Sequence, residues 1–365
     1  MSVERRTVLK TAAAATAAGP FAGLVNAPAG AAHKPPRPGD LVPVKDKRDG
    51  VVRLHLPRGF NYRSFHDTEQ TVTLTDGTRL PGRHDGMGAF AGPDDTVILV
   101  RNHELNNPPP PNPPGTAFGG PDTPAPYDVR ALGGTTTIQV TKQGEVIRAF
   151  TSLNGTMMNC SGGIMPWGSW VTCEETVNGP DVGPDFTGAS NVALQKPHGF
   201  VFEVPASVQP GSGQSNREPI THAGRFAHEA VSFDPVHNYL YLTEDNFAFP
   251  SGFYRYRPPS VAMDVGRIED GGTLQMLKVK GVTNAHLEAH QAQDATYDVE
   301  WVDIPEPFKV FDYTPGEVAT TPNDTALQFV GSQGHAQGAA YFSRLEGQIY
   351  DDGIVYFTST QGGGA

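Results

Sequence analysis

The sequence predicts an all-β protein and, within that class, a β-propeller. Three observations lead to this prediction. The chain of 365 residues carries 42 glycines and 33 prolines, so turns interrupt it often. Most of the remainder reads as short apolar or alternating runs of Val, Ile, Tyr, Phe and Thr, which is the pattern of strands. Finally, one strand–turn–strand pattern recurs four times along the chain.

The first 32 residues read as an export signal and are set apart from the fold. Arg5 and Arg6 precede an alanine-rich apolar run, and "NAPAGAA" at 26–32 offers small-residue cleavage sites. This is the pattern of a twin-arginine signal. We therefore expect the twin-arginine machinery to export the folded protein to the periplasm or the extracellular space. Downstream, no run is apolar for long enough to span a membrane.

The rest of the chain divides into a polar, proline-rich segment at 33–50 and a propeller domain at 51–365. Within the domain, the proline-rich stretch 107–128 is expected to run extended over the surface. The stretch 285–297, "AHLEAHQAQDATY", is the one place where we expect a short helix.

Each of the four repeats consists of an apolar strand, a turn, a second strand and a polar cluster. The repeats span 86–104, 161–176, 228–246 and 346–363, and simpler strands are expected at 134–140, 146–152, 199–205 and 252–258. In a propeller, like-placed strand ends converge on one face, so polar ends that recur in register favour this fold. A β-sandwich, which requires only alternation, is the alternative.

Acidic and amide side chains stand at the polar ends of the repeats. They are Asn102, Glu104, Glu174, Glu175, Glu229, Glu244, Asp245 and Glu346. Converging carboxylates repel one another unless a cation lies among them, and hard oxygen ligands suit Ca²⁺. Each acid alone reads as a solvated strand end, but the recurrence favours a metal site. The net charge of −12 is compatible with bound cations and disfavours nucleic acid as a partner.

The two cysteines, Cys160 and Cys173, allow three interpretations. In an exported chain, a pair of cysteines most often forms a disulfide. Cys173, on a strand with alternating neighbours, is equally explained as a buried core thiol. Cys160 lies in "NCSGG", where the glycines permit close backbone approach to a metal or to another strand. A thiolate ligand would shift the metal preference toward iron.

Three arginines lie next to the polar ends. For Arg101 and Arg225 we expect salt bridges to neighbouring acids. Arg344 stands two residues before Glu346, and its planar guanidinium is suited to capture of a phosphate or a carboxylate.

Four motifs carry a family resemblance in combination. They are "RNHE", "NCSGG…PWGSWVTCEET", "GRFAHEAVSFDP…YLTEDN…GFYRYRP" and "RLEGQIYDDGIVYFTSTQGG". Together they resemble the PhoX-type alkaline phosphatase family, from about residue 50 to the last residue. The resemblance implies a six-bladed propeller, exported by the twin-arginine route, that hydrolyses small-molecule phosphate monoesters. We expect it to act as a monomer.

The resemblance also implies a cluster of Fe³⁺ and Ca²⁺ bridged by an oxo group. By motif, Cys160 would supply a thiolate to iron, with Glu229 and Glu346 as carboxylate ligands. The acids of "RNHE", "CEET" and "TEDN" would complete the calcium side, and Arg344 would hold the phosphate. A metal-bound oxo or hydroxo group would then be the nucleophile, so that no serine or histidine nucleophile is required.

The chain departs from the family pattern at its end. It stops at "STQGGGA", directly after a strand, where family members continue with further strands. We therefore expect an incomplete last blade.

Two other functions remain open, namely a secreted calcium-binding propeller without catalysis and a calcium-dependent lactonase-type hydrolase. The constellation of Cys160, Glu229, Arg344 and Glu346 favours the phosphatase over the first of these, because a calcium-binding module needs no thiolate.

Overall fold

The structure is a computed structural model that describes residues 40–67, 70–107, 117–121, 123 and 125–361. The export signal expected at 1–32 and much of the loop 107–128 lie outside the described residues. The chain divides into two compact units, Met1–Phe65 and His66–Ala365. Within the described residues, no helix is long and apolar enough to cross a membrane.

The described part of the first unit is a β-hairpin of β1 (Leu41–Lys45) and β2 (Val52–Pro57). Its first strand falls inside the proline-rich segment 33–50. The buried Asp46 holds the hairpin to the residues that follow, because its carboxylate accepts the backbone N–H groups of Arg48 and Ser64 at 2.8 and 3.1 Å.

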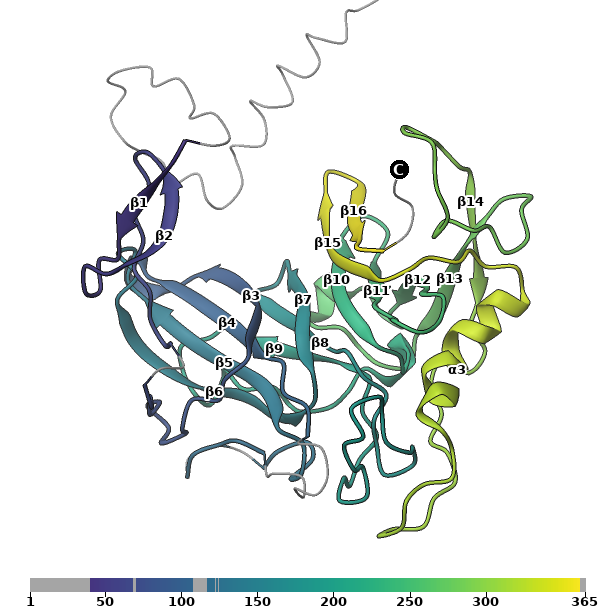
Figure 1. The fold of residues 1–365 in the computed structure, drawn as a ribbon, viewed down its shortest axis with the longest axis horizontal. Coiled ribbons are helices and arrows are strands. Elements are labelled where there is room, and N and C mark those ends of the chain that lie inside the picture. Colours follow the sequence, from purple (N-terminus) through teal and green to yellow (C-terminus); the bar gives the residue numbers. More distant parts are fainter. Residues whose placement is uncertain (1–39, 68–69, 108–116, 122, 124, 362–365) are drawn as a thin grey trace, which may run out of the picture. The chain divides into compact units, whose positions relative to one another are not determined.

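In the described part of the second unit, the strands form four antiparallel sheets (Figure 1). The first contains β3 (His84–Ala91), β4 (Val97–His103), β5 (Gly133–Val140) and β6 (Val146–Thr156). The second contains β7 (Asn159–Met165), β8 (Ser169–Glu174) and β9 (Val201–Pro205). The third contains β10 (His228–Asp234), β11 (Tyr239–Glu244), β12 (Phe253–Arg257), β13 (Thr273–Val279) and β14 (Val299–Asp303). The fourth contains β15 (Leu345–Asp351) and β16 (Ile354–Ser359).

The all-β prediction is confirmed, and the sheets are arranged as propeller blades. Each of the four repeats is the first hairpin of one sheet, and the simpler predicted strands are β5, β6, β9 and β12. The first strands of successive sheets contact one another, β3 with β7, β7 with β10, and β10 with β15. Because the first strand of each sheet is the one that meets its counterparts, the polar ends of the four repeats are brought to a common place.

A separate apolar core fills each space between neighbouring sheets. Val100 and Leu153 of the first sheet pack with Phe202 of the second. The largest core joins the second and third sheets and includes both cysteines, and a further core joins the third sheet to the fourth through residues such as Phe253 and Leu345. The blades are therefore held to one another mainly by side chains, and not by hydrogen bonds between sheets.

The glycines of "NCSGG" allow other strands to approach β7. A Cβ atom on Gly162 would lie 2.0 Å from the carbonyl oxygen of Val171 on β8, and one on Gly163 would lie 2.1 Å from that of Val231 on β10. Of the two roles that the sequence leaves open for these glycines, the structure shows approach to another strand.

The helices differ from the sequence prediction. No helix forms over 285–297, because this stretch pairs its backbone with another segment: the N–H groups of Leu287 and Glu288 donate to the carbonyl oxygen of Tyr341 at 3.0 and 3.1 Å. The longest helix described is instead α3 (Asn323–Ala336). Its two glycines lower helix propensity and hide it from sequence analysis, but Gly334 lets α3 lie against Met276 of β13. Within the described residues, the other helical pieces are η3 (Pro93–Asp95), η4 (Thr221–Ala223) and α2 (Ala262–Val265).

A buried ion pair ties three loops of the second unit together. Arg225 donates to both carboxylate oxygens of Asp181 at 2.6 and 2.9 Å. Its guanidinium also donates to the carbonyl oxygens of Val177, His198 and Lys309, and both members of the pair are buried. The salt bridge expected for Arg225 is confirmed.

We predict that Arg225→Met lowers the free energy of unfolding by about 3–5 kcal/mol, because it leaves the Asp181 carboxylate buried without its partner. Equilibrium urea unfolding followed by tryptophan fluorescence measures this. The matched control is Glu300→Gln at the half-exposed Lys278–Glu300 pair near the surface, where the N–O distance is 3.2 Å. That change should cost less than about 1 kcal/mol. Equal losses in the two variants would contradict the prediction.

Candidate metal centre

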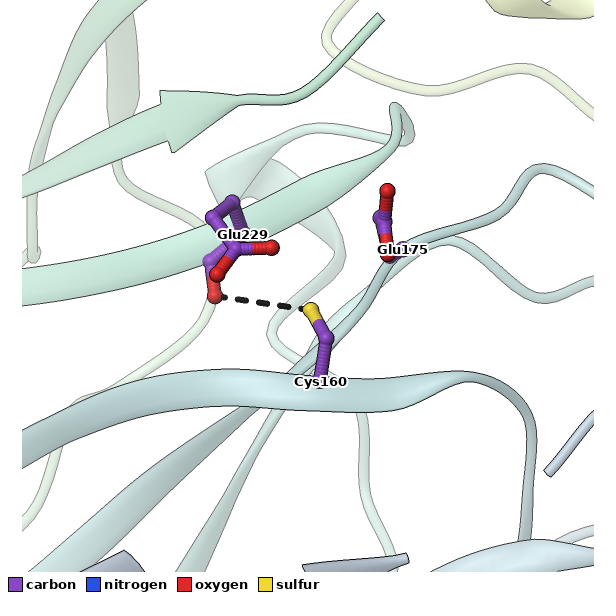
Figure 2. A group of neighbouring side chains, drawn as sticks. All are labelled: Cys160, Glu175 and Glu229. Carbon is purple, nitrogen blue, oxygen red and sulfur yellow. Dashed lines mark hydrogen bonds between the residues drawn. The ribbon is translucent and has the colours of Figure 1, made fainter. Parts of the chain in front are cut away.

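Five side chains from three neighbouring sheets converge in two overlapping groups. Cys160, Glu175 and Glu229 form one group, and Glu229, Asp245 and Glu346 form the other. Within each group the ligand atoms lie within 4.8 Å of one another, and Glu229 belongs to both. Figure 2 shows the first group, in which the thiol and the two carboxylates come from different strands. All five residues were among the predicted metal ligands.

The strand register explains why these residues meet. The pairing of each first hairpin is irregular directly after its first residue pair, as between Asn159 and Gly162 or between His228 and Val231. The second residue of the first strand stands next to the irregularity, and in the second, third and fourth sheets its side chain belongs to the converging groups. In the four blades, taken in chain order, this residue is Asp85, Cys160, Glu229 and Glu346.

A second repeated position faces the first. On the second strand of each hairpin, one residue pairs with the first residue of the first strand. The second repeated position is the residue that follows it, and in chain order the four residues are Glu104, Glu175, Asp245 and Thr360. The two converging groups are thus drawn from these two positions in the second, third and fourth sheets, and Asp85 and Glu104 hold the same positions in the first sheet outside both groups. Sequence reasoning missed Asp85, which lies just before the segment taken as the first repeat. The repeat alignment itself is the signal that would have found it.

Side-chain alternation separates the members of the adjacent acid pairs. Successive side chains of a strand point to opposite faces. Glu175 and Asp245 therefore face the centre, while Glu174 and Glu244, one residue earlier, point into their own blades and are buried.

Glu174 and Glu244 are engaged in hydrogen bonds away from the two groups. The Glu174 carboxylate accepts hydrogen bonds from the backbone N–H groups of Met157, Gly199 and Phe200 and pairs with the His198 ring at 2.6 Å. These bonds tie β8 to the segments beside it. The Glu244 carboxylate accepts from the N–H of Gly252 at 2.7 Å and from the Tyr254 hydroxyl at 2.9 Å, and burial raises its pKa to about 7.

Asn102 is also engaged elsewhere. Its Oδ1 accepts hydrogen bonds from Trp170 at 3.0 Å and Thr172 at 2.9 Å, and its Nδ2 donates to the carbonyl oxygens of Cys160 and Ser161. Because both acceptor sites of the amide oxygen are occupied, the structure gives Asn102 the role of a brace between the first two sheets. Its Nδ2 thereby holds the backbone carbonyl of Cys160 in place.

Glu104 lies at the edge of the site. Its carboxylate pairs with Arg83, and its charge helps to raise the pKa of Glu175. It is outside both of the groups in which ligand atoms lie within 4.8 Å of one another.

The electrostatics show that negative charge at the centre is poorly compensated. Burial, together with the neighbouring carboxylates, raises the pKa of Glu175 to about 9 and that of Glu229 to about 8. Burial also raises the pKa of the Cys160 thiol, whose Sγ lies 3.3 Å from the carbonyl oxygen of His228 and 3.6 Å from that of Glu229 (Figure 2). With protein groups alone, the carboxylates retain protons that a cation would replace.

The donor set therefore fits metal ions. Carboxylate oxygens from several strands suit a hard cation such as Ca²⁺, and the thiol at one end of the cluster adds a soft ligand of the kind that transition metals prefer.

Arg344 is the protein cation that pairs directly with members of the two groups, whereas Arg83 pairs with Glu104 at the edge. Its Nε and Nη2 donate to the two carboxylate oxygens of Asp245 at 3.1 and 3.2 Å, and Nη2 also lies 3.3 Å from Glu346 Oε1. Glu346 is in turn held by the Thr360 hydroxyl at 2.6 Å. Among the residues that the structure describes, none accepts a hydrogen bond from Arg344 Nη1. The backbone of Arg344 adopts a left-handed conformation with φ 47°, which is uncommon for a residue other than glycine.

Two sequence expectations are corrected here. Both cysteines are free thiols, so the disulfide interpretation is wrong, and Cys173 is a core thiol. The salt bridge expected for Arg101 is also wrong: in the described parts of the chain no acid pairs with it. Its Nη2 donates to Thr136 Oγ1 at 3.2 Å, and burial lowers its pKa to about 10.

The chain resembles a solved structure, and its sequence matches a known protein family. Among solved structures, the chain is similar to Pseudomonas fluorescens PhoX in complex with vanadate, a transition state analogue, with 18% sequence identity and a TM-score of 0.48. The alignment covers 77% of this chain and 60% of that one. No match was found among curated proteins. A sequence model of the family described as alkaline phosphatase PhoX matches residues 40–365. By this match, the chain belongs to the PhoX alkaline phosphatase family.

Proposed function

We propose that the protein is an exported, metal-dependent phosphatase that hydrolyses phosphate monoesters at the carboxylate–thiol cluster. The observation that carries the proposal is the placement of Arg344. Its guanidinium is fixed by Asp245 and Glu346 at the edge of a cluster suited to metal ions, while Nη1 is left for a ligand. A guanidinium beside bound cations is a site for an oxyanion. Membership in the family supports the same reaction.

The residues divide into two sets by donor type. The thiol of Cys160, with the carboxylates of Glu175 and Glu229, would hold iron; Glu229, Asp245 and Glu346 would hold calcium. The family resemblance places Glu346 on iron, whereas in this structure Glu346 belongs to the group without the thiol. When bound, the metal ions would polarise the phosphoryl group and activate the oxygen nucleophile that attacks it.

The side chains have complementary tasks. Arg344 would bind a phosphoryl oxygen through Nη1 and balance the charge that develops on it in the transition state. Asp245 and Glu346 keep the guanidinium in its plane, and the Thr360 hydroxyl keeps Glu346 oriented. The proposal assigns no nucleophilic role to a serine or histidine.

The two alternative functions explain less of the site. A calcium-binding propeller without catalysis has no use for the buried thiol of Cys160 or for the available donors of Arg344, and neither does a lactonase that depends on calcium alone. Export by the twin-arginine route is part of the proposal, supported by Arg5 and Arg6 in the sequence.

We predict that the purified protein contains both calcium and iron, and that Cys160→Ser lowers the iron content while calcium is retained, because only the thiolate distinguishes the two kinds of site. Elemental analysis of protein purified without chelators measures this. The matched control is Cys173→Ala, a buried thiol in the apolar core, which should retain iron. Calcium without iron in the unmodified protein would contradict the iron assignment.

We also predict that Glu346→Gln lowers the turnover of p-nitrophenyl phosphate by about 100-fold or more, because it removes a charged ligand and one of the two partners of Arg344. Steady-state hydrolysis with calcium and iron supplied is the assay. Glu317→Gln, the same change at an exposed carboxylate, should leave the rate unchanged. Turnover retained in Glu346→Gln would show that the active site lies elsewhere.

A further inference from the structure

Phe247 is an exposed aromatic side chain next to the candidate site. It lies two residues after Asp245, and 65% of its surface is accessible to solvent. Its ring centroid lies 4.1 Å from the guanidinium carbon of Arg344. A single exposed apolar residue is ordinary on a protein surface. This one, however, is in contact with the arginine to which the phosphatase proposal assigns the phosphoryl group.

The loop that carries Phe247 is held in place by side chains. The buried Asn246 accepts hydrogen bonds at Oδ1 from the backbone N–H groups of Ala248 and Phe249, at 3.1 and 3.0 Å. The buried Ser251 hydroxyl accepts from the N–H of Asn246 at 3.2 Å and from that of Arg344 at 3.1 Å. One serine thus holds both the start of the loop and the backbone of Arg344, so the two side chains that meet at 4.1 Å extend from backbones tied to the same hydroxyl.

The contact leaves part of the ring available to a ligand. The guanidinium covers part of the ring through a cation–π contact, and the exposed remainder faces solvent beside Arg344. A phosphoryl group bound to Arg344 Nη1 would have its ester substituent close to this exposed surface. A planar ring in that substituent could stack on Phe247, which an alkyl chain cannot do in the same way.

We infer that Phe247 determines the substrate class of this site and selects phosphate monoesters whose alcohol carries an aromatic ring next to the phosphate. The inference rests on the proposed function for the role of Arg344. The contribution of Phe247 is to bind the leaving group, and it leaves the bond-breaking step to the metal cluster and Arg344.

Binding of two non-hydrolysable ligands tests the inference. Phenylphosphonate and methylphosphonate share the phosphonate and differ in the ring, and titration calorimetry on the metal-loaded protein gives Kd for each. The unmodified protein should bind phenylphosphonate about 3- to 10-fold more tightly, as expected for one aromatic contact. In Phe247→Leu the two Kd values should become nearly equal, while Phe247→Trp should keep the preference. Phe186→Leu, which removes a ring that is 93% exposed elsewhere on the surface, should leave the ratio unchanged.

Hydrolysis provides the second readout. The ratio of kcat/KM for p-nitrophenyl phosphate to that for glycerol 2-phosphate should fall about 3- to 10-fold in Phe247→Leu. A general disturbance of Arg344 would instead lower both rates equally and leave the ratio intact.

The outcomes separate the two proposals. Hydrolysis of both esters with equal phosphonate affinities in the unmodified protein would overturn the role of Phe247 alone. A preference for phenylphosphonate that depends on Phe247, without hydrolysis of either ester, would overturn the phosphatase reaction alone. If neither phosphonate binds, the inferred role of Phe247 in ligand binding is also wrong.

Discussion

Repulsion among carboxylates is the constraint on which the rest of the site depends. The first strands β10 and β15 carry Glu229 and Glu346, and Asp245 follows the second strand β11; these three carboxylates lie within 4.8 Å of one another, and Glu175 joins Glu229 in the other group. Burial makes the repulsion stronger, because it removes the water that would screen these charges. Arg344 pairs with Asp245 and Glu346, and Arg83 pairs with Glu104, so Glu175 and Glu229 have no direct cationic partner among the ion pairs of the described residues. The raised pKa values of Glu175 and Glu229 express that imbalance, and it is the physical reason for assigning cations to this place.

The protein creates this concentration of charge by repeating two positions, and the same repetition limits it. Strand alternation sends every second acid away from the centre. Glu174 and Glu244 therefore serve as buried acceptors for backbone N–H groups, whereas Glu175 and Asp245 remain at the centre. An isolated buried carboxylate is stabilised only when its lone pairs are satisfied, and Glu174 meets this requirement fully. Neighbouring acids of identical chemistry thus have opposite roles, one in the fold and one at the centre.

Much of the fold and the core of the site could be predicted from sequence. The four repeated hairpins and the convergence of acids such as Glu229 and Glu346 follow from alternation and recurrence, which are local patterns. The choice of Cys160 as a ligand among three interpretations came from the family resemblance. Other features depend on partners far away in the chain. The brace formed by Asn102 requires Trp170 on another sheet, and nothing near Arg101 in the sequence shows that its neighbour would be a threonine.

The helices were also mispredicted because their formation depends on residues far away in the chain. The 285–297 stretch has the composition of a helix but pairs its backbone with residue 341, whereas α3 contains glycines that a sequence pattern discounts and that packing against Met276 requires. Asp85 was missed for a simpler reason: the repeat was read from a glycine one residue too late.

The separate cores between blades have a consequence for the order in which the protein assembles. Cys160 and Glu346 are about half the chain's length apart in sequence, and each inter-blade core takes its residues from two sheets, so it forms only when those sheets come together. Closing such long loops is entropically costly and slow. The centre is therefore completed only after the hairpins have formed and docked. Metal ions would bind the assembled ligands far better than the separate strands. Their binding would therefore stabilise the state in which the blades are docked, and only correctly assembled molecules would gain this stability.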